Sequence, residues 1–180
     1  MLKAIDIENE KSSPHFHLNK SVCLEIEKIL AAEGAMVSGT YGAWSFYCTA
    51  DFKEIPKAKV AVEKSSYTQD DYSLFQSVFN LSTWTIYSHQ LKFSARIRKA
   101  NILDKLGLSS YNKLFPDLNY YGNCKKSKQD LFGSICSTIK PLMQSQALYY
   151  FKIQDAKLIL KFEKDHTFLS EFIELRDQFK

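Results

Sequence analysis

The clearest alternation of apolar and polar positions lies near the end of the chain. Residues 149–154 and 158–163 both alternate with a period of two, and residues 154–156 separate them. This pattern predicts two strands joined by a tight turn. One face of such a hairpin is apolar, and a two-stranded ribbon alone is only marginally stable in water. Residues 168–179 follow with apolar side chains at helical spacing and charged residues on the other side, so they predict a helix that covers the hairpin.

Two earlier segments also have the helical pattern. Residues 19–33 place their apolar side chains on one stripe, and Gly34 follows where a left-handed residue would end the helix. Ser127 is followed three positions later by Asp130, which approximates a capping box and predicts the start of a second helix. Pro141 marks the expected end region of that helix.

Strand-like segments lie between these helices. Residues 36–52 are rich in aromatic side chains, and their glycines leave two interpretations open, a kinked strand or two strands around a small turn. Residues 57–64 alternate and predict an exposed strand, whereas residues 65–71 are polar and predict a turn. The alternation in 84–97 changes phase, so a turn or a bulge is expected within residues 88–90.

Other segments are shorter or less regular. Residues 72–81 have apolar side chains at mixed spacing, for which a short helix is slightly favoured over an irregular apolar insertion. Residues 102–106 predict a helical turn or two that ends at Gly107. Residues 120–121 predict a short edge strand, and residues 1–13 are either a frayed end or another short edge strand.

The order of these elements predicts an α+β fold. A leading helix, several strands, a second helix, a hairpin and a last helix fit a mainly antiparallel sheet covered on one face by about three helices. The hairpin and the C-terminal helix end the chain. Its 180 residues are the size of a single globular domain, 1–180. Its composition, 45% hydrophobic and 24% charged, excludes the disordered and coiled-coil classes.

Charge and cysteine content narrow the function classes. The net charge is +4, from 24 basic and 20 acidic residues, which favours solubility over a general nucleic-acid footprint. The four cysteines form no C-x-x-C pair, so they predict reduced thiols in a cytoplasmic protein. Acidic residues interrupt the amino-terminal segment, and no apolar stretch reaches the length of a membrane span. Neither export nor membrane insertion is expected.

Four features along the chain also carry a resemblance. A helix leads into the Gly-Thr-Tyr-Gly segment at 39–42, and a charged strand at 57–64, a basic strand at 92–98 and a terminal helix, hairpin and helix over 127–179 follow. This order resembles a loose group of uncharacterised bacterial proteins. Members of that group are often attached to a membrane by helices that this sequence does not contain. The resemblance implies no known activity and transfers no functional residue.

Residues that often carry chemistry are present, but not at catalytic spacing. His15, His17 and Cys23 are the types found in metal sites, yet two histidines separated by one residue near a polar terminus are more often solvated. Cys136 would be a nucleophile only if folding brought a histidine to it, and a small buried thiol is the favoured interpretation. No phosphate-binding glycine loop or serine elbow is found. We therefore predict no catalytic residue, no metal ligand and no cofactor.

The favoured function is a non-enzymatic domain that binds another protein. One layer of helices covers only one face of a sheet, and large exposed aromatic surface marks interfaces. Aromatic side chains fall on both faces of one predicted strand, namely Tyr41, Trp44, Phe46 and Tyr47. Tyr41 and Trp44 are the predicted binding residues on this hypothesis. The oligomeric state is left open.

Two alternatives come from other function classes. The first is a nucleic-acid-binding module in which the basic strand supplies Lys92, Arg96 and Arg98, beside the aromatic ring of Tyr87. The same charges on a solvated sheet face would also protect an edge strand without any ligand. The second alternative is an enzyme whose site is assembled only by folding, from a histidine with Cys136 or a carboxylate.

Overall fold

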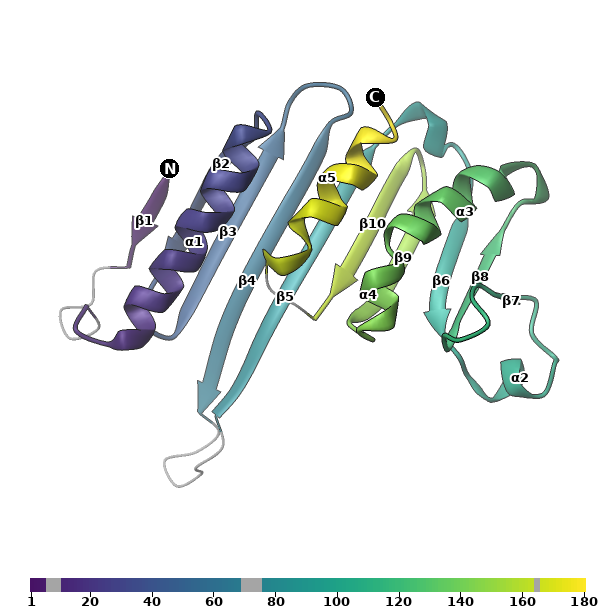
Figure 1. Cartoon of the computed structure of the whole chain (residues 1–180), viewed down its shortest axis with the longest axis horizontal. Helices are drawn as coiled ribbons and strands as arrows, with labels where there is room; N and C mark the ends of the chain where they lie inside the picture. The colour runs from purple at the N-terminus through teal and green to yellow at the C-terminus, as the bar shows by residue number, and fades with distance from the viewer. Residues whose placement is uncertain (6–10, 69–75, 164–165) are drawn as a thin grey trace.

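The computed structural model describes residues 1–5, 11–68, 76–163 and 166–180. Its strands form one ten-stranded sheet in the order β1-β2-β3-β4-β5-β10-β9-β6-β8-β7 (Figure 1). The strands are β1 Leu2–Ala4, β2 Met36–Tyr41, β3 Ser45–Phe52, β4 Ala58–Thr68, β5 Gln76–Tyr87, β6 Ala95–Lys99, β7 Asn112–Lys113, β8 Tyr120–Cys124, β9 Leu148–Gln154 and β10 Lys157–Phe162. The helices are α1 Pro14–Ala32, α2 Ile102–Lys105, α3 Gln129–Thr138, α4 Lys140–Gln144 and α5 Leu169–Asp177, with 3-10 turns η1 His89–Leu91, η2 Lys126–Lys128 and η3 His166–Phe168.

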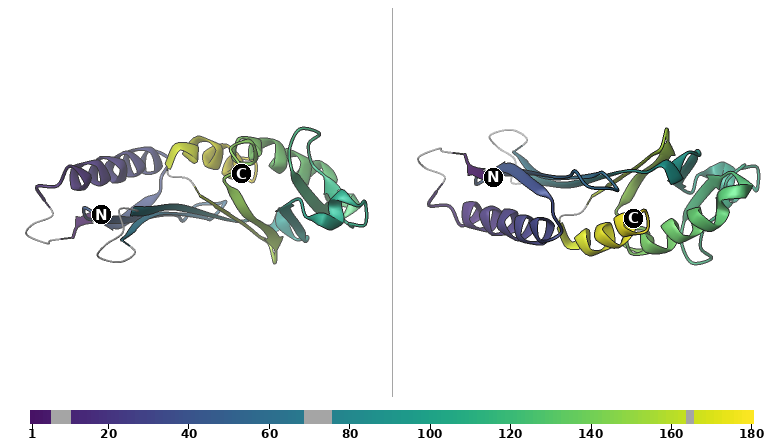
Figure 2. Two further views of the ribbon diagram at one scale, coloured as in Figure 1. Left: turned by 90° about the horizontal axis from the view of Figure 1, so that it is seen from below. Right: turned by 90° about the horizontal axis from the view of Figure 1, so that it is seen from above.

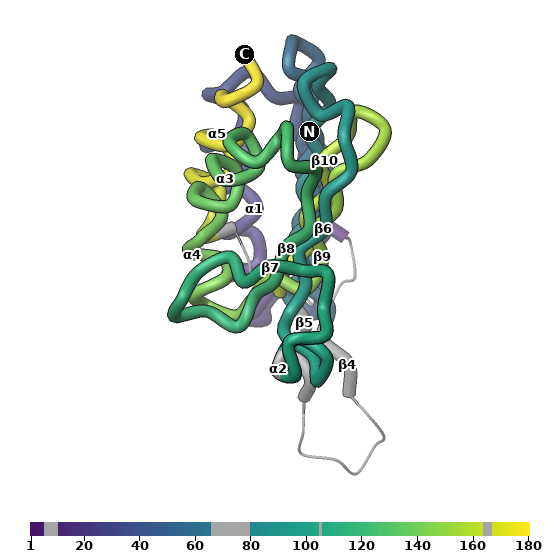
Figure 3. The backbone as a smooth tube through the Cα atoms, turned by 90° about the vertical axis from the view of Figure 1, so that its right-hand side faces the viewer, coloured from purple at the N-terminus to yellow at the C-terminus, as the bar shows by residue number. Residues whose placement is uncertain are grey.

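Helices cover one face of this sheet. In the edge-on views, α1, α5, α3 and α4 lie against the same face (Figure 2). Seen from the β7 end, the same helices stand on one side of the strands (Figure 3). The short helix α2 follows β6, and its Asp104 binds Arg98 of that strand. The pairings are antiparallel except for β1 with β2. The expected α+β fold is confirmed, with α2 and α4 as short additions to three longer helices.

The C-terminal hairpin occupies the middle of the sheet. Strands β2 to β5 form an antiparallel meander, and β5 and β6 are consecutive strands along the chain. They are nevertheless not neighbours, because β10 pairs with β5 and β9 pairs with β6. The turn η1 lies in the short connection that passes over the end of the inserted hairpin. This turn confirms the change of phase expected at residues 88–90.

An aromatic cluster joins the hairpin to the last helix. The Trp84 ring of β5 lies 4.7 Å from the Phe162 ring of β10 and 5.5 Å from the Phe172 ring of α5, measured between centroids. Phe52 of β3 lies 5.6 Å from Phe172. All four side chains are buried. The expected covering of the hairpin by a C-terminal helix is therefore confirmed.

The first helix begins earlier than its apolar stripe predicts. The side chain of Ser13 accepts a hydrogen bond from the amide of His15, and Pro14 occupies the first turn, where it loses no helical hydrogen bond. The helix thus begins at residue 14, not at 19. Its end agrees with the prediction, because Gly34 has a positive φ of 82°.

Several strand predictions need correction. Residues 36–52 form two strands, β2 and β3, so the kinked-strand alternative is wrong. The expected turn at 65–71 is wrong as far as Thr68, because β4 continues to that residue in register with β5. The helix favoured for 72–81 is also wrong from Gln76 onward, where β5 begins, and residues 72–75 lie outside the described residues.

The predicted start of the second main helix is displaced. Ser127 lies inside η2, and α3 begins two residues later without a side-chain cap. The expected capping box with Asp130 is therefore wrong. The expected end region at Pro141 is confirmed, because α3 ends at Thr138, and Pro141 itself occupies the first turn of the next helix, α4.

Candidate nucleic-acid interface

The uncovered sheet face has an unusual charge distribution. Strands β5, β10, β9, β6 and β8 are adjacent in the sheet, and their sequences contain no Asp or Glu. Buried residues such as Leu158, Leu160 and Ile153 face the helices, so the residues that alternate with them face the opposite side. Five cations occupy those alternate positions, and one of them, Arg98, is paired with Asp104. The other four define what we call the basic face: Arg96, Lys152, Lys157 and Lys161.

Two cations of the basic face lie directly opposite one another. Arg96 of β6 is the register partner of Lys152 of β9. Like charges directly opposite on an antiparallel pair destabilise it. Within the described residues, neither side chain forms an ion pair or a hydrogen bond. An anion placed between them would remove this repulsion.

Tyrosine rings lie beside the lysines. Tyr87 of β5 is 45% exposed, and the Nζ of its register partner Lys157 lies 5.3 Å from the ring centroid. Tyr150 of β9 is 38% exposed, and the Nζ of its partner Lys161 lies 6.0 Å from that ring. Rings and ammonium groups thus alternate across neighbouring strands, which is the combination that binds bases and phosphates of single strands.

Acidic side chains mark the edge of the basic face. On the neighbouring strands β3 and β4, Asp51 forms an ion pair with Lys59 at 3.7 Å. Glu63 of β4 also lies on the open side, two positions from Ala61. Burial, followed by the carboxylates of Glu163 and Glu63, raises the pKa of the Tyr149 hydroxyl. The acids of β3 and β4 thus lie on one flank of the basic face, and the carboxylates of Glu63 and Glu163 act as far as Tyr149 of β9.

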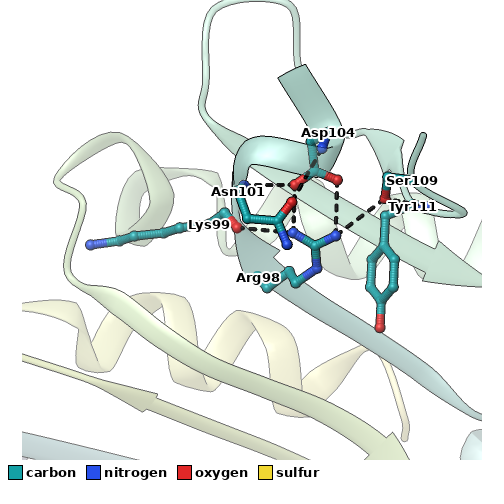
Figure 4. Close-up of polar contacts among 6 residues, drawn as sticks. All are labelled: Arg98, Lys99, Asn101, Asp104, Ser109 and Tyr111. Carbon is teal, nitrogen blue, oxygen red and sulfur yellow. Dashed lines mark hydrogen bonds and ion pairs between the residues drawn. The ribbon is translucent and has the colours of Figure 1, made fainter. Parts of the chain in front are cut away.

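Arg98 lies near the basic face but is held by other groups. Its Nη2 donates to Asp104 Oδ1 at 2.9 Å and to Ser109 Oγ at 3.2 Å (Figure 4). The guanidinium carbon lies 4.4 Å from the centroid of the Tyr111 ring. The hydrogen bond from Arg98 lowers the pKa of Asp104 to about 2, which shows the tight pairing. The charge of Arg98 is thus already neutralised, and its role in binding stays a prediction.

The aromatic residues around the β2–β3 turn are divided between the core and the surface. Phe46 is buried beneath the helix layer, and Tyr41 is half-buried with its ring 5.5 Å from that of Phe16. Trp44 is 51% exposed and Tyr47 is 45% exposed. Asn19 holds the turn, because its Nδ2 donates to the carbonyl oxygens of Gly42 at 2.8 Å and Ala43 at 3.1 Å.

The groups weighed as metal ligands or nucleophiles do not converge. Cys23 is buried and faces Cys48, with 3.2 Å between the sulfur atoms, whereas His15 and His17 are exposed. No group of three His, Cys, Asp or Glu suited to a metal occurs among the described residues. Burial raises the pKa of the Cys136 thiol to about 12, so this thiol is protonated at neutral pH.

The sequence alone does not identify most of the basic face. Arg96 and the nearby Lys92 were predicted, and Lys92 is exposed in the segment that precedes β6. Lys152, Lys157 and Lys161 were missed as binding residues, although alternation places them on the polar side of the hairpin. The sequence feature that could have identified them is the absence of Asp and Glu from the five strands β5, β10, β9, β6 and β8.

The comparisons with known proteins identify no relative. No protein-family model, no curated protein and no solved structure matches this chain. Within the described residues, no helix combines the length and the apolar character needed to cross a membrane. Any functional argument therefore depends on the geometry of the sheet face.

Proposed function

We propose that this protein binds single-stranded nucleic acid across the basic face. The observation that supports this most directly is the opposed pair Arg96 and Lys152, which has no acidic partner among the described residues. Phosphate groups would supply the missing negative charge and relieve the repulsion between the two side chains. Binding at this surface needs no catalytic group, so the protein acts as a binding module.

A single strand fits this surface better than a duplex. The open face is a sheet surface, and the helices α1, α3, α4 and α5 lie on the opposite face of the sheet, where they cannot enter the groove of a duplex bound here. Tyr87 and Tyr150 instead offer exposed rings beside cations, and unstacked bases bind such rings. The net charge of +4 is small, but its uneven distribution places cations without acids where a strand would lie.

A salt titration tests the proposal. Labelled single-stranded RNA and DNA are titrated with the protein, and binding is followed by fluorescence anisotropy. If the four cations of the basic face each neutralise one phosphate, the affinity should fall about 50-fold between about 50 and about 200 mM salt. A duplex of the same sequence should bind more weakly. Failure of every single strand to bind at low salt would reject the function.

A pair of charge reversals separates the basic face from general attraction. Lys152→Glu reverses a cation at the centre of the face, whereas Lys28→Glu reverses an exposed cation on α1, on the other side of the sheet. Both variants have the same net charge. We expect Lys152→Glu to weaken binding more than tenfold and Lys28→Glu to change it little. Equal losses would mean that binding depends on net charge alone.

Protein binding is the second candidate, and one observation favours it. Trp44 is half exposed in a turn that Asn19 holds in place, and exposed tryptophan is common at the energetic centres of interfaces. Tyr41 and Phe46 are less available, because both pack against the helix layer. A pull-down from the native cell tests this candidate: a partner that the native protein retains and that Trp44→Ala loses would support it, and a native protein that retains no partner would contradict it.

A further inference from the structure

A groove adjoins the basic face where β6 and β8 meet the segment before η2. Its volume is about 330 Å³, and its lining includes Ser94, Arg96, Tyr111, Asn123 and Lys125. A second groove of about 510 Å³ shares Ser94 and Lys125 with the first and adds Lys92. The two hollows therefore adjoin one another. The first includes Arg96, whose strand β6 pairs with β9 on one side and with β8 on the other.

The chemistry of the first groove fits an anion. Arg96 and Lys125 supply positive charge, and Ser94 and Asn123 supply uncharged hydrogen-bond donors. No carboxylate lines this groove, and the adjoining groove has a single acid in its lining, Asp155 of the turn between β9 and β10. Arg96 is the register partner of Asn123, so cation and amide lie on adjacent strands.

An aromatic wall distinguishes this groove from the rest of the basic face. Tyr111 is half-buried, and its ring is held against the guanidinium group of Arg98. The Arg98 group is in turn fixed by Asp104 and Ser109. The ring therefore stands in a defined orientation beside the donors, as a base-stacking platform requires.

We infer that this groove binds a phosphomonoester, as found at the phosphorylated end of a nucleic-acid strand. The inference deepens the proposed function and rests on it for the strand that carries the phosphate. A phosphomonoester carries a charge of about −1.5 to −2 at pH 7, more than a phosphodiester within the chain. Two cations with two neutral donors match this extra charge, and the terminal base would stack on Tyr111. A free nucleoside monophosphate offers the same chemistry.

The test compares single strands that differ only at their ends. One short sequence is prepared with a 5′-phosphate, with a 3′-phosphate and with hydroxyl groups at both ends, and each is titrated by fluorescence anisotropy. We expect one phosphorylated form to bind about tenfold more tightly than the hydroxyl form, because the charged donors gain a stronger partner. This preference should decrease as the pH is lowered below about 6, where the second phosphate proton binds.

Two matched variants test whether this groove causes the preference for a phosphorylated end. Lys125→Gln removes a cation that lines both grooves, whereas Lys126→Gln removes an exposed neighbouring cation that lines neither. Lys125→Gln should abolish the preference for the phosphorylated end, and Lys126→Gln should keep it. If all three strands bind the native protein equally, the inference about the groove is wrong although the proposed function stands.

A last measurement separates the two sources of the phosphate. Adenosine monophosphate is titrated into labelled protein, and amide chemical shifts are followed at Ser94, Asn123 and Lys125. Shifts that Lys125→Gln removes, together with no binding of any oligonucleotide, would support the groove as a mononucleotide site and reject the proposed function. Absence of both the shifts and the end preference would reject the groove as a phosphate site.

Discussion

Gly39 shows how a single residue sets the approach of two strands. A Cβ at this position would lie 2.1 Å from the carbonyl oxygen of Tyr47 in the paired strand β3. We expect Gly39→Ala to lower the free energy of unfolding by about 1–3 kcal/mol or more, because the backbone of β2 or β3 must move. Gly133→Ala is the matched control, since no atom lies within 4 Å there and alanine should stabilise α3 by about 0.5–1 kcal/mol. Urea denaturation measures both, and a Gly39→Ala variant as stable as native protein would contradict the close approach.

Asp104 makes stability depend on pH in a definite direction. The hydrogen bond from Arg98 lowers its pKa from 3.8 to about 2 in the folded protein. A group with a lowered folded pKa adds stability above its unfolded pKa and loses this contribution as the pH falls through the folded value. We therefore expect part of the stability to be lost between about pH 4 and pH 2. Thermal melts across this window should show a smaller pH dependence for Asp104→Asn, and identical pH profiles would contradict the pairing.

Single residues were predicted where the cause is local. Gly34 was expected to end the first helix, and its positive φ confirms this, because helix ends depend on neighbouring backbone groups. Gly39 was expected to allow a tight turn. It lies inside β2 instead, where the absence of a side chain allows the close approach of the neighbouring strand β3. Arg98 was expected to be a free surface cation, although its partner Asp104 is brought to it by the chain reversal at α2.

Elements defined by local alternation were predicted best. The C-terminal hairpin and its covering helix follow from period-two and helical patterns that lie within about 30 residues of one another. The part of segment 72–81 from Gln76 onward was misjudged, because the consecutive apolar residues Val78 and Phe79 interrupt the clean alternation that would have indicated a strand. The displaced start of α3 has a similar reason. Ser127 lies in a 3-10 turn whose geometry the capping pattern does not reveal.

The packing of helix α5 on the sheet should contribute strongly to stability. Phe172 has no exposed surface and contacts both Trp84 and Phe52. Phe172→Ala should lower the free energy of unfolding by about 3–5 kcal/mol, because it leaves a cavity between helix and sheet. Ser170→Ala, at an exposed position of the same helix, should change it by less than about 0.5 kcal/mol.

Truncation of the same helix is a stronger form of this test. Ending the chain at residue 166 would uncover Trp84 and Phe162 and remove a large part of a typical net stability of about 5–15 kcal/mol. We expect the fragment to be insoluble or to lack a cooperative melt. A fragment that melts like the full chain would mean that α5 contributes little to the folded domain.

At the scale of the whole molecule, strand order produces the charge pattern. Lys152, Lys157 and Lys161 come from the last hairpin, whereas Arg96 comes from a strand more than 50 residues earlier. The sheet places these strands side by side, and the acids of β3 and β4 lie beyond β5. Sequence patterns predict which face of a strand is polar but not which strand lies beside it. The basic face was therefore predicted only in part, through Arg96.

The position of the hairpin also has a consequence for how the protein is made. Residues 148–162 fill the space between β5 and β6, yet the ribosome adds them after both of these strands. Until they emerge, the nascent meander β2–β5 has an unpaired edge at β5, and β6 has no partner on that side. Unpaired edges are where chains associate wrongly. The sheet is therefore completed from its middle, by two strands that are translated after its other described strands.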